Sequence, residues 1–231
     1  VVKEVYGPEA ARVMLGWRLP AATDPSNDVA DIVGSVLYNG QAGLIDLDLN
    51  QQQKVLSAYA YASAQPDYGT FLMAGSPKAG QSLDEVRDLL LAEAAKIRAG
   101  EFDEGLIKAS INNYKMQLMN EFDKYDQRAM FYVYSFIYGI RQLERMEKIT
   151  KQDVVDWANK YLGPESYAIV YKREGKDPGE QKIAAPKITP IATNRDAQSV
   201  FLTEIQNTEV KPIEPVFVDY KKDMSQFEAR K

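Results

Sequence analysis

The sequence predicts an α+β fold in which a mainly antiparallel sheet of about four strands carries a layer of helices on one face. Residues 55–64 alternate between alanine and serine or tyrosine, the two-residue period of a strand. Residues 81–120 hold two apolar patterns with the period of helices. The predicted order of strand, helix, hairpin, four helices and strand gives a split βαβ relationship of the ferredoxin-like kind.

The first part of the chain predicts two strands and two helices. Residues 1–6 favour a short strand, and residues 12–19 alternate apolar side chains before a proline, which predicts a longer one. The Asp-Pro pair that opens residues 24–39 is typical of a helix start. Residues 44–49 predict a further short helix.

The predicted hairpin has two different faces. Its alanines, at even positions from 58 to 64, form a row of small side chains that lets a helix layer lie close to the sheet. Tyr59 and Tyr61 are therefore expected to face away from the helices. Residues 66–69 predict a turn, and residues 70–75 the return strand.

The two helices of residues 81–120 have defined ends. Ser82 and Glu85 form a capping box, and Gly100 follows a cationic last turn, which is typical of a helix end. Asp103 is expected to cap the second helix.

Three more elements complete the predicted fold. Residues 126–139 are rich in residues that favour strands, but their place between helices favours a helix. Thr150 and Asp153 predict a capped helix that runs to about Tyr161, and residues 167–171 predict the last strand.

The character of the chain changes after residue 174, where prolines interrupt a polar stretch. We predict a domain over residues 1–174, a linker over 175–212 and the start of a following domain or strap over 213–231. Residues 197–205 predict one or two helical turns, and residues 215–220 a strand.

Composition excludes several classes of function. The chain has no His, which excludes a Ser-His-Asp triad and every zinc site that needs imidazole. A formal net charge of −5 argues against a nucleic-acid partner, and no apolar run has the length of a membrane span. A Cys-free chain fits the cytoplasm or the periplasm, and we lean to the periplasm. Because the chain begins with Val, we expect a fragment or a processed product.

Three patterns could carry chemistry but have simpler interpretations. Residues 75–82 match a phosphate-binding loop except that Gln81 replaces the essential lysine, which favours a turn and a helix cap. Asp24, Asp28 and Asp31, and separately Asp46 and Asp48, could bind a divalent cation, but acidic residues in the first turns of helices more often complement the helix dipole. The aromatic residues at positions 131, 132, 134, 136 and 138 are interpreted as core rather than as a cofactor site.

Tyr59 and Tyr61, together with Arg18, are the candidate ligand contacts. If the sheet has a face without helices, these three residues lie on it. Aromatic residues and arginine are typical of contact surfaces. The alternatives are an ordinary solvated face and a face covered by another domain.

Six segments resemble the non-catalytic second domain of the M16 (insulinase or pitrilysin-like) zinc metallopeptidases. They read RVMLGWRLP, DPSNDVADIVGSVLYNG, VLSAYAYASAQPDYGTFLMAG, SLDEVRDLLLAEAAKIRAG, FDEGLIKASINNYKMQLMNEF and ITKQDVVDWANKYLGPESYAIVYKREG. The resemblance lies in their order and spacing and covers about two thirds of the chain. The tail resembles the linker between the two halves of such an enzyme. Residues 40–45 lack the Ser-Arg pair that often follows the family's Gly-rich turn, so no role is carried over to them.

The resemblance implies the fold shared by LuxS and the mitochondrial processing peptidases. It also implies that the parent protein is a zinc metalloendopeptidase, in which zinc and the H-x-x-E-H motif belong to the preceding domain. No catalytic or metal-binding residue is therefore assigned in this chain, and no cleavage is expected from the chain alone. The expected partners are a peptide substrate and other M16 domains of the same polypeptide or of a partner subunit. On this basis the chain is a structural, substrate-enclosing domain of a closed peptidase chamber. The alternatives are a peptide-binding or scaffolding domain of an inactive M16-like assembly and a free-standing α+β binding module.

Overall fold

The computed structural model of the chain describes residues 1–138, 143–179, 184, 186–191, 193–209, 211 and 213. The chain divides into two compact units, Val1–Gln181 and Lys182–Lys231. The sheet and seven of the described helical segments belong to the first unit. The second unit holds the described helix α7 (Val200–Asn207), in the part of the chain where one or two helical turns are predicted.

The first unit is built on a five-stranded sheet, which confirms the predicted mainly antiparallel α+β fold. The strands lie in the order β1-β5-β2-β4-β3. Only the pair of β1 and β5 is parallel. The strands are β1 (Val2–Gly7), β2 (Arg12–Leu19), β3 (Ser57–Ser63), β4 (Gly69–Ser76) and β5 (Tyr167–Glu174).

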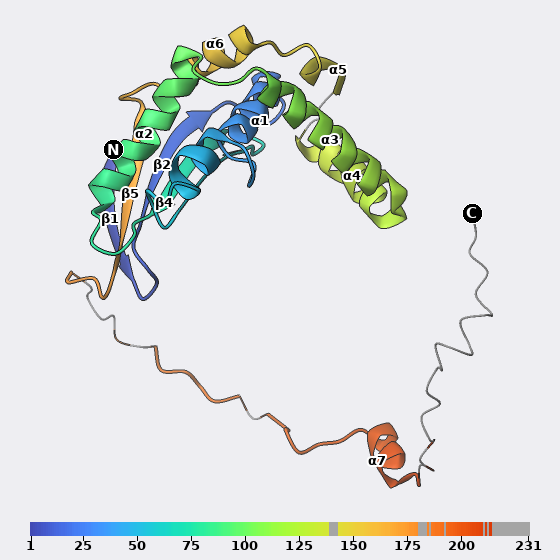
Figure 1. Cartoon of the computed structure of the whole chain (residues 1–231). Helices are drawn as coiled ribbons and strands as arrows, with labels where there is room; N and C mark the ends of the chain where they lie inside the picture. Colours follow the sequence, from blue (N-terminus) through green and yellow to red (C-terminus); the bar gives the residue numbers. More distant parts are fainter. Residues whose placement is uncertain are drawn as a thin grey trace, which may run out of the picture. The chain divides into compact units, whose positions relative to one another are not determined.

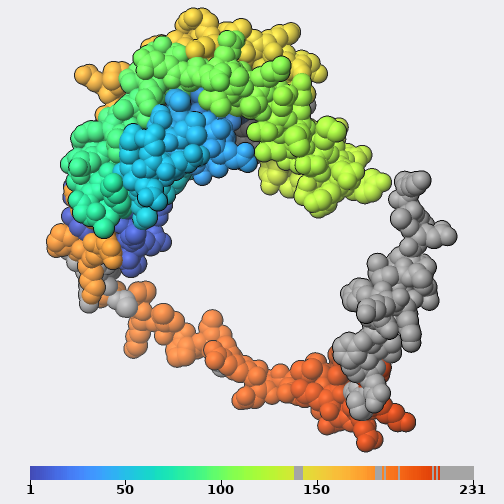
Figure 2. Space-filling model, viewed as in Figure 1, coloured from blue at the N-terminus to red at the C-terminus, as the bar shows by residue number. Residues whose placement is uncertain are grey.

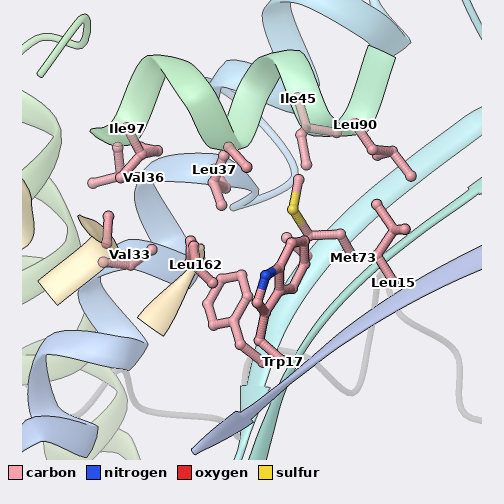
Figure 3. Close-up of a cluster of buried hydrophobic side chains, with 14 of the residues drawn as sticks. Leu15, Trp17, Val33, Val36, Leu37, Ile45, Met73, Leu90, Ile97 and Leu162 are labelled. Carbon is pink, nitrogen blue, oxygen red and sulfur yellow. The ribbon is translucent and has the colours of Figure 1, made fainter. Parts of the chain in front are cut away.

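The helices pack on one face of this sheet, as Figure 1 shows for α1, α2 and α6. The helical segments of the first unit are α1 (Ser26–Leu37), the π-helix η1 (Asp46–Asn50), α2 (Leu83–Ala99), α3 (Gly105–Asp123), α4 (Tyr125–Tyr138), α5 (Leu143–Met146) and α6 (Lys151–Tyr161). Side chains from the sheet and from α1 and α2 meet in the core (Figure 3). Trp17 lies fully buried there, and its indole N–H donates to the carbonyl of Gly163 at 3.0 Å.

The two capping boxes predicted from the sequence begin their helices, but the prediction of Asp103 as the cap of α3 is wrong. Glu104 holds the N-cap position of α3 without a side-chain hydrogen bond, because α3 starts one residue later than predicted, and Asp103 accepts from the N–H of Gly105 at 2.8 Å. Ser82 and Glu85 form a reciprocal capping box on α2, and Thr150 and Asp153 form one on α6. The box lowers the pKa of Asp153, because the side chain and the backbone N–H of Thr150 both hydrogen-bond its carboxylate. Gly100 ends α2 with a left-handed φ of 73°.

The connection from α1 to η1 is a tight loop held by one carboxylate. Asp46 is buried, and its Oδ2 accepts hydrogen bonds from the backbone N–H groups of Asn39, Gly40 and Gly43 at 3.0, 3.0 and 3.1 Å. A Cβ at Gly43 would lie 2.5 Å from the carbonyl oxygen of Leu37, so only glycine fits there. Gly40 has a φ of +80°, which also favours glycine.

The predicted aromatic helix exists as α4, but its interpretation as core is wrong for the side chains that the structure describes. Within the described residues α4 has no buried side chain, and Phe136 is 91% exposed. The helix packs on α3, with which it extends away from the sheet (Figures 1 and 2). Aromatic residues are buried only where a second layer covers them, and among the described elements α3 is the one on which α4 packs extensively.

The predicted domain boundaries at residues 174 and 212 remain predictions. The predicted strand over residues 215–220 lies outside the described residues. No helix in the described part of the chain combines the length and the apolar character needed to cross a membrane.

Candidate functional site

The sheet has one face opposite the helix-covered core, which we call the open face; its side chains are exposed or half-buried except Ala74, which is fully buried. It consists of the even-numbered residues of β2, β4 and β5 and the odd-numbered residues of β1 and β3. The opposite face contributes to the core through the odd-numbered residues of β2 and β5, through Phe71 and Met73 of β4, and through Ala58 and Ala60 of β3. The even-numbered residues of β2 are exposed or half-buried, whereas Val13, Leu15 and Trp17 are fully buried. The three candidate contacts, Arg18, Tyr59 and Tyr61, all lie on the open face.

The two tyrosines form a pair. The rings of Tyr59 and Tyr61 stack with centroids 6.1 Å apart and planes 15° apart. Tyr59 also contacts the ring of Tyr38, which follows α1, at 6.4 Å. Tyr61 remains 46% exposed. The pair therefore offers an aromatic surface at β3, which is an edge strand of the sheet.

Arg18 lies apart from the tyrosine pair. It is exposed on β2, opposite Thr70 of β4, and β4 separates it from β3. Its guanidinium lies 4.8 Å from the ring centre of Tyr68. From the sequence, Tyr68 is predicted only as part of a turn. Arginine often stacks on aromatic rings. A tyrosine in a turn next to the end of the strand that carries Arg18 was therefore the sequence feature that could have predicted this contact.

Two further cations occupy the other end of the open face. Arg12 forms an ion pair with Glu9 at 3.2 Å. Lys172 pairs with Arg12 in the strand register, and its Nζ donates to the carbonyl oxygens of Gly7 and Ala10 at 3.3 and 3.2 Å and also to that of Glu9. Neither residue was predicted as a contact, because the register that places them on one face is set by long-range pairing.

Three of the acidic residues considered for metal binding, Asp24, Asp28 and Asp46, make contacts within the fold. The buried carboxylate of Asp28 accepts from Nε of Arg145 at 2.7 Å. Asp24 accepts from the backbone N–H of Ser26 at 2.9 Å, and hydrogen bonds from Ser26 lower its pKa. Asp46 holds the loop before η1 through its three hydrogen bonds.

Asp48 belongs to a chain of charges around Lys96. The Nζ of Lys96 lies 2.6 Å from Asp48 and 2.9 Å from Glu93, which is itself buried. Burial raises the pKa of Glu93, and the hydrogen bond from Lys96 only partly offsets this effect. Burial lowers the pKa of Lys96, but its hydrogen bonds to the two carboxylates outweigh burial and raise that pKa overall. This cluster links α2 to η1.

The phosphate-loop pattern folds as a turn followed by a cap, as the simpler interpretation predicts. Gln81 accepts from the backbone N–H of Lys78 at 3.2 Å and donates to the carbonyl of Lys54 at 2.9 Å. Gly80 has a φ of +78°. The side chain at the lysine position of the motif is thus used to fix the loop.

The described residues offer no set of side chains that fits a zinc ion. Zinc in proteins is held by Cys, His and carboxylates, and the chain has no Cys and no His. In the described ranges, no three acidic side chains come together in a way that could hold a metal ion. No step of metal chemistry is therefore assigned to this chain.

The comparison with protein families identifies the fold. The model of the peptidase M16 inactive domain matches residues 1–114. The chain carries an M16 peptidase inactive domain. Among curated proteins, no sequence matches the chain. The matched residues contain β1 to β4, α1, η1, α2 and about the first half of α3, whereas β5 lies beyond them.

Solved structures share the fold over a longer part of the chain. A protease from Helicobacter pylori is 16% identical with a TM-score of 0.69, over 74% of this chain and 43% of its own. The inactive peptidase domain of a candidate zinc protease from Bordetella parapertussis is 14% identical with a TM-score of 0.62, over 71% of this chain and 93% of its own. A chain of Complex III2 from Candida albicans is 14% identical with a TM-score of 0.61, over 74% of this chain and 45% of its own. The matched part of this chain therefore covers less than half of two of these chains and almost the whole of the Bordetella domain.

Proposed function

We propose that this M16 inactive domain encloses peptide substrates beside a separate zinc-binding domain and supplies contacts, but no catalytic group, for their cleavage. The observation that carries the proposal is the match of residues 1–114 to an inactive M16 domain, in a chain without His. A zinc peptidase needs a polarising metal and an activated water. In this proposal both come from the zinc-binding domain, on the same polypeptide or on a partner subunit.

The open face is the surface that this role requires. A domain that encloses a substrate needs an exposed surface with apolar and hydrogen-bonding groups, and a packed layer behind it that keeps the surface rigid. The stacked Tyr59 and Tyr61 supply the first, and the core beneath β3 and β4 supplies the second. Arg18 adds a cation at the end of β2.

The experiment is to incubate the 231-residue chain with peptides and zinc, alone and after addition of a zinc-binding M16 domain from the same polypeptide or subunit pair. The proposal predicts no cleavage by the chain alone and chelator-sensitive cleavage after the addition. Chelator-sensitive cleavage by the chain alone would overturn it. The same result from the zinc-binding domain without this chain, at equal kcat/KM, would also overturn it.

A second function follows from one comparison. The matched chain from Candida albicans is part of Complex III2, a multi-subunit assembly. The alternative is that this domain scaffolds an assembly that cleaves no peptide. A parent and partners without any H-x-x-E-H motif would favour that alternative.

A further inference from the structure

The open face has an ordered arrangement of charge and apolar surface. Strand pairing aligns Tyr61 with Leu72 and Gly16 in one row, and Tyr59 with Ala74 and Met14 in the next. Lys3 of β1 belongs to the row of Tyr59, at the opposite edge of the sheet, through its pairing with Val170. Over β2, β3 and β4 these two rows are apolar, and they lie between a row that ends in Arg18 and a row that contains Arg12 and Lys172. The apolar band is therefore bounded by cations at both ends of the strands.

The charge of this face is opposite to that of the chain. The chain has a formal net charge of −5, yet the open-face positions of the five strands hold four cations, Lys3, Arg12, Arg18 and Lys172, and one carboxylate, Glu174. Arg12 is paired with Glu9. In the described part of the chain, neither Arg18 nor Lys172 forms an ion pair; Arg18 lies over an aromatic ring and Lys172 donates to carbonyl oxygens.

The spacing of the rows matches that of an extended peptide. Adjacent rows are two residues apart, which is about 6.6 Å along a strand. The Arg18 row and the Arg12 row are six residues apart, or about 20 Å. A peptide that runs along the strands in extended conformation has the same repeat, so its side chains i, i+2, i+4 and i+6 can lie over the four rows in turn.

The row of Tyr61 also has room for a ligand side chain. A Cβ built on Gly16 meets nothing within 4 Å, so space is open above the backbone between Leu72 and Ala168. Tyr61 borders this row at the edge of the sheet. An apolar side chain placed there would contact aromatic and aliphatic surface on one side and backbone below.

Resting on the proposed function, we infer that the open face selects extended peptide segments with the pattern acid-x-apolar-x-apolar-x-acid. The peptide lies along β2 and β4, with its two apolar side chains over the rows of Tyr61 and Tyr59. Its two carboxylates lie beside Arg18 at one end of β2 and beside Arg12 and Lys172 at the other. Charge complementarity favours acidic peptides over basic ones. A nucleic acid is a poorer fit, because the centre of the face is apolar and a phosphate backbone needs clustered cations along its whole length.

The test compares three seven-residue peptides by NMR titration of the ¹⁵N-labelled chain. The first is blocked Glu-Ser-Phe-Ser-Leu-Ser-Glu, the second has Lys in place of both Glu residues, and the third has Gln there. The expected result is shifts at the amides of Gly16 and Leu72, and a Kd at least fivefold lower for the Glu peptide than for the Lys peptide at low salt. This difference should shrink at 0.5 M salt, because ions screen exposed charges.

Matched variants separate charge on the open face from net charge. Arg18→Glu should abolish the preference for the Glu peptide. Lys108→Glu makes the same change in net charge on an exposed residue of α3 and should leave the preference intact. Equal effects of the two variants would overturn the inference.

The outcomes distinguish this inference from the proposed function. If all three peptides bind equally and Tyr59→Ala with Tyr61→Ala weakens all of them, the acidic preference is wrong and the peptide-contact role stands. If no peptide shifts the amides of the open face, both are wrong. If a single-stranded oligonucleotide displaces the Glu peptide at a lower concentration than the Gln peptide does, the face binds phosphate and the inference is overturned.

Discussion

Replacing Asp46 should destabilise the first unit more than replacing its neighbour Asp48, although the two look alike in sequence. Asp46 is 5% exposed, and one of its oxygens accepts three backbone N–H groups. Asp48 makes a partly exposed ion pair with Lys96. The first carboxylate is buried with its hydrogen bonds, whereas the second has water as an alternative partner.

The expected magnitudes follow from these contacts. Asp46→Ala leaves the buried N–H of Gly43 without a partner, which costs about 1–3 kcal/mol, and removes two partly buried bonds that contribute about 1 kcal/mol each. The expected loss is about 3–5 kcal/mol. Asp46→Asn keeps an acceptor oxygen but weakens the three bonds from charge-assisted to neutral, a loss of about 2–3 kcal/mol. Asp48→Asn should cost less than about 1 kcal/mol.

The assay is urea unfolding followed by tryptophan fluorescence. Both tryptophans, Trp17 and Trp157, are buried in the first unit, so their emission reports its unfolding. Far-UV circular dichroism should give coincident transitions, and the slope of free energy against urea should stay constant across the variants. A loss below about 1 kcal/mol for Asp46→Ala, or equal losses at positions 46 and 48, would refute the assigned role of this carboxylate.

Four further predictions use the same unfolding assay. Gly43→Ala should destabilise the chain by at least about 3 kcal/mol, because the added Cβ would lie 2.5 Å from a backbone oxygen. Gly40→Ala is strained only by the positive φ at that position and should cost about 1–2 kcal/mol. Equal costs of the two substitutions would contradict the assigned clash at Gly43. The pKa of Glu93 is raised, so the contribution of this residue to stability is full below its ordinary pKa of 4.5 and falls as pH rises through the raised pKa. Glu93→Gln should therefore gain stability relative to the parent chain as pH rises from about 4.5 to 7. The same pH dependence of stability in both proteins would contradict this. Thr150→Ala should cost about 1 kcal/mol through loss of the α6 cap, and full stability of this variant would show that the cap contributes nothing. Phe136→Ser should change stability by less than about 0.5 kcal/mol, since the ring is 91% exposed, while a loss above 2 kcal/mol would restore the core interpretation of α4.

Much of the fold could be predicted because local patterns carry it. The alternation around Tyr59, the capping box at Ser82 and the glycine at position 100 each depend on a few neighbouring residues, and all three have the expected structure. The fifth strand, β1, was foreseen only as a short strand, because its parallel pairing with β5 joins residues about 167 positions apart. Such pairing leaves no local signature.

The candidate face could be predicted only in part for the same reason. Alternation within one strand places Tyr59 and Tyr61 together, and the structure places both on the open face. It cannot show that Arg12 and Lys172 share that face at the other end, because this depends on how β2 and β5 are aligned. The contrast between Asp46 and Asp48 was equally hidden, because burial of one carboxylate depends on the path of the loop before it.

The most direct test of the peptide-contact role is steady-state kinetics of the peptidase assembled from this chain and its zinc-binding domain. Tyr59→Ala with Tyr61→Ala should raise the KM for a peptide substrate severalfold and leave kcat within about twofold, because the pair contacts substrate without touching the reacting atoms. Tyr125→Ala, an exposed tyrosine on α4, is the matched control and should change neither value. Unchanged KM and kcat in the double variant would contradict the assignment of the open face as the substrate-contacting surface.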